Sequence, residues 1–286
     1  MKKFSYNENI DALEVSELFF TEGLKQAEKK GYKNIRVMKD SSAPASAALD
    51  LSALSEGSLI ESINISQDIN VKKVDFTPLY RCNQLKELRL PYFKGVVDFP
   101  KIKNLQTLYI TATKDEVENL ILNDVNDLLL TGIKNKDLTF LSAPKLEVLR
   151  LSGGSIESLN GLQTSEKLST IGISHCSKLS DIKVLSKLKT LDSISVEKCK
   201  ELRDYSFLSG NATLKKLFAS ELSSLAFLPS LKKIEFVKFW EVEDGDLDPL
   251  LNTETLRTVD FYPNRKHYTH TNEHIDELLL ERHKRN

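Results

Sequence analysis

The chain has 286 residues, of which 40% are hydrophobic and 28% are charged, so it carries enough apolar material for a folded core. Its formal net charge is −1, which excludes attraction to nucleic acid or to an anionic membrane through overall charge. Since no stretch is apolar for long enough to span a bilayer and three cysteines do not make a disulfide framework, we expect a reduced, cytoplasmic protein.

Residues 1 to 58 differ in pattern from the rest of the chain. The spacing of their apolar residues predicts a helix between Asp11, its N-cap, and Gly31, its stop. Ile35 and Val37 then alternate with polar residues as in a short strand. We predict that this segment forms an α/β cap for the repeats that follow.

One sequence unit recurs between residues 59 and 262. Its most regular copies run from Leu168 to Leu185 and from Leu191 to Leu208, each with the pattern L-x-x-L-x-L-x-x-C, in which Ile or Val can replace Leu. This pattern resembles that of leucine-rich-repeat proteins, in the internalin-like short-repeat branch with cysteine-containing repeats. The resemblance implies an α/β solenoid of about ten parallel strands on a concave face, with short helical or 3₁₀ returns and helical N- and C-terminal caps.

The repeat template predicts where each strand lies. Its first positions are Ile60, Leu85, Leu105, Val125, Leu146, Leu168, Leu191, Leu214, Leu231 and Leu256. The step from Leu214 to Leu231 is the shortest in this series and predicts an irregular turn. Residues 263 to 286 are predicted to form a helical cap that begins at Thr271 or Asn272, so that cap, repeats and cap make one continuous structural domain.

Strand side chains alternate between two faces, so every second template position should point away from the core. The resulting concave face carries both signs of charge, and its aromatic residues are of the type that anchors partners. The candidates for partner binding on this face are Arg89, Tyr109, Arg150, Phe218, Glu235, Asp260 and Tyr262.

A second candidate surface lies in residues 239 to 248, which place five acidic residues beside the single tryptophan. We interpret it as an acidic loop suited to a basic partner; a solvated loop with the tryptophan packed beneath it is the alternative. An EF-hand is excluded, because its sixth and twelfth positions would be Pro249 and Thr255. The candidate residues of this loop are Phe239, Trp240, Glu241, Glu243, Asp244 and Asp246.

Histidines and cysteines are the remaining candidates for chemistry. His267, His270 and His274 lie close enough in sequence to suggest a zinc site. Because they lack the HExxH spacing, roles in capping and hydrogen bonding are favoured. Cys176 and Cys199 occupy one position of neighbouring repeats, where buried reduced thiols are favoured over a redox pair. Nucleotide-binding glycine loops and nucleophile motifs are missing from the sequence. We therefore predict no enzyme, no catalytic residues, no metal and no cofactor.

These observations predict a monomeric protein-binding module that contacts neither nucleic acid nor membrane directly. Short bacterial repeat proteins of the type it resembles include immunity proteins. The resemblance therefore implies binding and neutralisation of a cognate toxin domain, most concretely a basic nuclease, in the cytoplasm. The alternatives are an adaptor or scaffold for an endogenous protein and, more remotely, a metal-dependent hydrolase that uses the C-terminal histidines.

Overall fold

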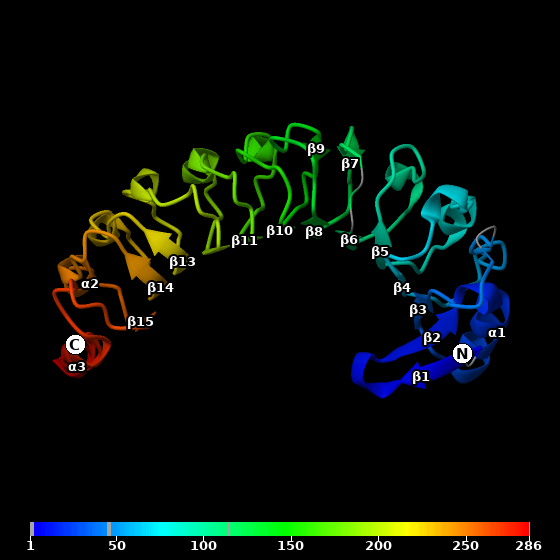
Figure 1. The fold of residues 1–286 in the computed structure, drawn as a ribbon, viewed down its shortest axis with the longest axis horizontal. Coiled ribbons are helices and arrows are strands. Elements are labelled where there is room, and N and C mark those ends of the chain that lie inside the picture. Colours follow the sequence, from blue (N-terminus) through cyan, green and yellow to red (C-terminus); the bar gives the residue numbers. More distant parts are fainter. Residues whose placement is uncertain (1–2, 45–46, 112, 114, 286) are drawn as a thin grey trace. The chain divides into compact units, whose positions relative to one another are not determined.

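A computed structural model describes residues 3–44, 47–111, 113 and 115–285 (Figure 1). The chain divides into two compact units. Unit 1 comprises Met1–Lys134 and Phe140–Leu146, and unit 2 comprises Asn135–Thr139 and Glu147–Asn286. Among the described residues, no helix is both long enough and apolar enough to cross a lipid bilayer.

Unit 1 contains seven strands of the main sheet in the order β1-β2-β3-β4-β5-β6-β8. The hairpin β1–β2 is antiparallel, and every later pair is parallel. The strands are β1 Phe4–Asn7, β2 Ala12–Ser16, β3 Asn34–Met38, β4 Ser62–Ile65, β5 Glu87–Pro91, β6 Thr107–Thr111 and β8 Asp127–Thr131. Helix α1 is Phe20–Lys30, and the short strands β7 Leu120–Ile121 and β9 Leu141–Ser142 pair with each other in a separate ladder.

Unit 2 continues the same repeat with six strands, all paired in parallel. They are β10 Val148–Ser152, β11 Thr170–Ser174, β12 Ser193–Glu197, β13 Lys216–Leu222, β14 Phe236–Val242 and β15 Thr258–Phe261. The short helix α2 is Asp248–Leu251, and the C-terminal helix α3, Asn272–Arg285, packs against β15 (Figure 1).

Several of the short segments that return between strands begin with a local cap. The Asp181 carboxylate accepts a hydrogen bond from the Lys183 amide at 3.0 Å, and Asp204 accepts one from Ser206 at 2.8 Å, each just before a 3₁₀ turn. Such turns suit crossings of only a few residues. The 3₁₀ returns are η3 Val71–Lys73, η4 Thr77–Arg81, η5 Phe99–Lys101, η6 Leu162–Thr164, η7 Lys183–Lys187, η8 Ser206–Leu208 and η9 Leu228–Ser230.

The core lies between the strands and these returns. In β11, Ile171 and Ile173 are buried and their neighbours are half-buried, and the same alternation recurs in β12. We call the opposite side of the strands, which carries the half-buried side chains, the outer strand face. Parallel strands at a short and regular repeat, buried template positions and 3₁₀ returns define a leucine-rich-repeat solenoid, so the predicted fold class is confirmed.

The N-terminal segment differs from the prediction in two respects. Residues Ala12–Ser16 form strand β2, and helix α1 begins only at Phe20, because β1 supplies a hairpin partner that the helical spacing could not reveal. Gly31 ends the helix as predicted, with φ +73°. Strands β2 and β3 pair in parallel with the repeats, so the parallel sheet begins within residues 1 to 58.

The predicted short step before Leu231 is wrong. Leu217 of β13 pairs with Val237 of β14, which pairs with Val259 of β15. The buried template positions of this repeat are therefore Ile234, Val237 and Phe239, and the repeat begins at Ile234 instead of Leu231. Measured from Ile234, the steps to the two neighbouring repeats are nearly equal, and both match the length of the other repeats.

Asp40 should make unit 1 lose stability in acid. The residue is buried, and its carboxylate accepts hydrogen bonds from Ser42 and from the Ser16 hydroxyl, which lower its pKa to about 2. Since the folded pKa lies below the ordinary value of 3.8, this stabilisation is complete above about pH 4 and is lost as the pH falls toward 2. Urea denaturation between pH 2 and pH 7 should show a smaller acid-induced loss for Asp40→Asn than for the wild type.

The matched variant is Ser42→Ala, which removes the largest cause of the lowered pKa and leaves the carboxylate in place. It should shift the acid transition of the wild type to higher pH. An identical pH profile in wild type, Asp40→Asn and Ser42→Ala would show that Asp40 does not contribute.

Candidate functional site

The most distinctive outer strand face in unit 2 lies across β13 and β14. These two strands have seven residues each, and they place Phe218 and Trp240 side by side with ring centroids 5.7 Å apart in an edge-on arrangement. Both side chains are half-buried, so their rings are supported by neighbours and still reach solvent. We call Phe218, Trp240, Lys198 and Lys238 the aromatic patch.

Two lysines complete the aromatic patch. Lys198 Nζ lies 5.9 Å from the centre of the Trp240 ring, and Lys238 Nζ lies 6.0 Å from that of Phe218. Lys238 also forms an ion pair with Asp260 at 2.6 Å, because the two residues are directly paired across β14 and β15. Cations at this distance from aromatic rings are attracted by the ring faces, so the lysines help to hold both rings in place.

Ion pairs border the patch at the ends of the strands. Glu221 and Glu241 are paired across β13 and β14, which sets two negative charges next to each other. Arg203 contacts Glu221 at 2.9 Å and also Glu243, and Arg265 contacts Glu241 at 3.4 Å. These two guanidinium groups offset two of the three negative charges, which reduces the like-charge repulsion between the paired strands.

Two of the predicted partner-binding residues are not available on this surface. Phe239 is fully buried, with its ring stacked on Phe261 at 4.8 Å, so it is a core residue. Glu235 precedes β14 instead of lying on its outer face, because this repeat starts later in the chain than predicted. Phe239 is thus wrong as a partner-binding candidate and the predicted place of Glu235 on the outer strand face is wrong, both because the repeat starts later than predicted.

The segment from residue 239 to residue 248 is not a free acidic loop. Its first four residues belong to β14, and Asp248 begins α2. Glu241 and Glu243 are ion-paired with arginines, and Asp248 contacts His270 at 2.7 Å. Asp244 and Asp246 are exposed and accept backbone hydrogen bonds from residues two positions later, and within the described part of the chain neither forms an ion pair.

The remaining candidates are not members of the aromatic patch. Arg89 and Tyr109 are neighbours in unit 1, with the guanidinium carbon 5.2 Å from the ring centre. Arg150 is half-buried on β10 in unit 2. Tyr262 follows β15 and is 80% exposed, so it adds an accessible aromatic ring close to Asp260 in sequence.

The C-terminal histidines have separate partners. His267 Nε2 lies 3.1 Å from the Val242 carbonyl oxygen, and His270 Nε2 lies 2.7 Å from the Asp248 carboxylate. The rings of His270 and His274 stack at 5.3 Å. Among the described residues, no group of three or more His, Cys, Asp or Glu side chains is arranged to hold a metal ion.

Cys176 and Cys199 are buried at the corners that follow β11 and β12. The Cys176 thiol lies 3.5 Å from the Gly153 and Ser174 carbonyl oxygens, which orient it within the turn. Hydrogen bonding to Cys199 and burial both raise the pKa of Cys176, so its thiol stays protonated. A protonated buried thiol is a poor nucleophile, which supports a structural role for Cys176.

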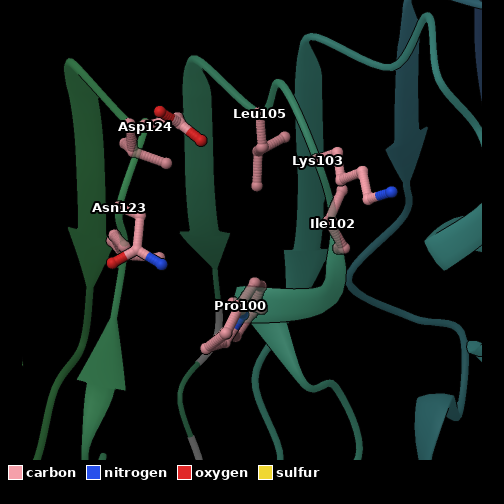
Figure 2. A pocket seen from close by; sticks show the side chains of 9 residues that line it. Pro100, Ile102, Lys103, Leu105, Asn123 and Asp124 are labelled. Carbon is pink, nitrogen blue, oxygen red and sulfur yellow. The ribbon is translucent and has the colours of Figure 1, made fainter.

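Figure 2 shows a hollow in unit 1 between the return segments that precede β6 and β8. It is bordered by Pro100, Ile102 and Leu105 on one segment and by Asn123 and Asp124 on the other. Its volume is about 70 Å³, below the several hundred Å³ typical of small-molecule sites. It is therefore a gap between neighbouring repeats and not a substrate site.

The residues that sequence reasoning missed are Lys198, Lys238, Arg203 and Arg265. The signal that could have identified Lys238 is the repeat length. If neighbouring repeats are assumed to be about equally long, Phe236, Lys238 and Trp240 fall on the outer strand face. Arg203 and Arg265 had no local signal, since Arg203 and Glu243 are 40 residues apart in sequence.

The fold and this surface define a leucine-rich-repeat solenoid with an aromatic patch on its strand face. No protein-family model matches the chain, and no curated protein matches it either. Among solved structures, the chain is similar to one titled "Crystal structure of mouse RP105/MD-1 complex", with a TM-score of 0.42 and 14% sequence identity. That match covers 88% of this chain, which spans 57% of the matched chain.

Proposed function

We propose that this chain is a protein-binding module that acts by binding and not by catalysis, and that its partner docks on the aromatic patch. The observation that carries the proposal is the pair Phe218–Trp240, accessible on the outer strand face and flanked by Lys198 and Lys238. Aromatic residues in supported, partly exposed positions are the usual anchors of protein interfaces. Solenoids present such residues on extended surfaces because each repeat contacts only its neighbours.

We further propose that the partner is a cognate toxin domain and that the chain is an immunity protein acting in the cytoplasm. Asp244 and Asp246 support the choice of a basic partner, because they are exposed at the end of β14 and carry charge that no ion pair offsets within the described residues. We expect the partner to cover Trp240 with an apolar or aromatic group and to place basic side chains beside these two carboxylates.

Trp240→Ala should weaken partner binding at least about 30-fold, which corresponds to the roughly 2 kcal/mol of an interface anchor. The ring is half-buried and belongs to the outer face, so the thermal midpoint should change little. The partner tested first is the protein encoded directly before this chain's gene, because an immunity gene is expected to follow its toxin gene. Calorimetric titration of the two purified proteins measures the affinity.

The matched control is Phe207→Ala, which removes a half-buried aromatic ring on the return side of the same unit. It should leave affinity unchanged. If Phe207→Ala and Trp240→Ala weaken binding equally, the docking site is wrong. If the neighbouring protein does not bind or is not toxic, while another protein binds through Trp240, the chain is an adaptor and the immunity proposal is wrong.

A further inference from the structure

Unit 1 carries a row of polar side chains on its outer strand face that differs from the aromatic patch. Arg36 on β3 is paired in register with Asn64 on β4, Asn64 with Arg89 on β5, and Arg89 with Tyr109 on β6. The residues flanking each of them along the strand are buried, so all four point to the outer face. Two strand spacings, about 10 Å, separate the backbones of the two arginines.

The two arginines have unequal partners. Arg36 forms an ion pair with Glu14 on β2 at 3.3 Å. Arg89 lies over the Tyr109 ring, and among the described residues its guanidinium has no ion pair and its buried Nε has no hydrogen-bond acceptor. Since the Nε atom is buried, a ligand oxygen would meet the terminal Nη groups of Arg89, whose positive charge no ion pair offsets among the described residues.

Two hollows open on either side of this row, and Arg36, Asn64 and Arg89 line both. One has a volume of about 330 Å³ and is also lined by Glu87, and the other has about 380 Å³ and is also lined by Asp68. Within the described residues neither acid is within ion-pair distance of Arg89. The hollows have room for a small anionic group together with the atoms that carry it.

We propose that Arg89, with Arg36 and Asn64, forms a binding site for an oxyanion, meaning a carboxylate or phosphate group with at least two free oxygens. The contact with the Tyr109 ring helps to hold the Arg89 guanidinium in place, and its paired N–H groups match two oxygens of such a ligand. The Asn64 amide supplies a further donor, and Arg36 a second positive charge that it shares with Glu14. The site lies in unit 1 and does not rest on the proposed docking at the aromatic patch.

The proposal is tested by ¹H–¹⁵N spectra of the arginine Nε–H groups in the full chain, recorded during two titrations. One probe is sodium phosphate, with sodium chloride at equal ionic strength as its control, and the other is an end-blocked tetraglutamate peptide, with tetraglutamine as its control. The Arg89 resonance, assigned by its loss in Arg89→Lys, should shift saturably with at least one anionic probe and with neither control. In the Arg89 variants, which lack that signal, binding is followed through the Arg36 Nε–H resonance. Arg89→Gln should weaken the binding at least about 10-fold and Arg89→Lys at least about 3-fold.

The matched control variant is Arg81→Gln, which removes an exposed arginine on the return side of unit 1. It should leave both titrations unchanged. A response to the peptide alone assigns the site to carboxylates of a protein partner, and a response to phosphate alone assigns it to a free anion. No saturable shift of the Arg89 resonance in the wild type, or an equal loss in Arg81→Gln, overturns the proposal, and the wild-type measurement decides even if Arg89→Gln does not fold.

Discussion

Replacing Phe239 with alanine should lower the free energy of unfolding by about 3 to 5 kcal/mol, the usual cost of removing a buried phenylalanine. The ring is fully buried, stacks on Phe261 at 4.8 Å and contacts the edge of Tyr268 at 6.4 Å. The neighbours belong to β15 and to the segment that leads into α3, so truncation opens a cavity between the last strands and the C-terminal cap. Urea denaturation followed by circular dichroism measures the loss.

The comparison that makes this result informative is Trp240→Ala, at the next position along the same strand. Trp240 is on the outer face, so its truncation should cost no more than about 1 kcal/mol. The two variants thus separate a core position from a surface position within a single pair of adjacent aromatic residues. Equal losses in the two variants would contradict the register that places Val237 and Phe239 inside.

Replacing Gly161 with alanine should destabilise unit 2 by about 2 to 6 kcal/mol, because left-handed backbone strain and overpacking both contribute. Gly161 has φ +110°, and a Cβ atom there would lie 2.3 Å from the carbonyl carbon and oxygen of Leu138. Backbone atoms cannot move aside as a flexible side chain can. The thermal midpoint and the urea midpoint of the purified variant measure the effect.

Gly153 provides the matched control. It also has a left-handed backbone, with φ +64°, but a Cβ atom there would meet nothing within 4 Å. Gly153→Ala should therefore lower the free energy of unfolding by only about 1 to 2 kcal/mol, the cost of a left-handed backbone conformation in a residue with a side chain. If Gly161→Ala loses no more stability than Gly153→Ala, the close approach to Leu138 does not restrict residue 161.

The repeat was readable from sequence because its signal is local and recurs many times. Ile171 and Ile173 in one repeat, and Ile194 and Val196 in the next, are apolar at the same positions and buried in the structure. The repeat that contains β14 shows the limit of this signal, because two sets of its residues fit the template. Leu231, Ile234 and Phe236 satisfy the template, and so do Ile234, Val237 and Phe239; only strand pairing with β13 and β15 selects the second set.

The candidate site was predicted only in part for the same reason. Phe218, Trp240 and Asp260 were identifiable as residues, and the structure brings the first two into ring contact and links Asp260 to them through Lys238. The acidic segment was misinterpreted, because charges can be counted from a sequence while the arginines that neutralise them cannot be located in it. Arg203 lies 40 residues before Glu243, and Arg265 lies 24 residues after Glu241.

The repeat, the parallel strands and the burial of the template positions could be predicted from the amino-acid sequence, since each depends on the spacing of apolar residues within a single repeat. Which side chains meet across neighbouring repeats depends on the folded structure. Cross-strand partners are set by hydrogen-bond register, and a shift in the start of one repeat changes which residues face outward. That register places Trp240 beside Phe218 and Arg89 over Tyr109, the two contacts on which the proposed binding surfaces depend.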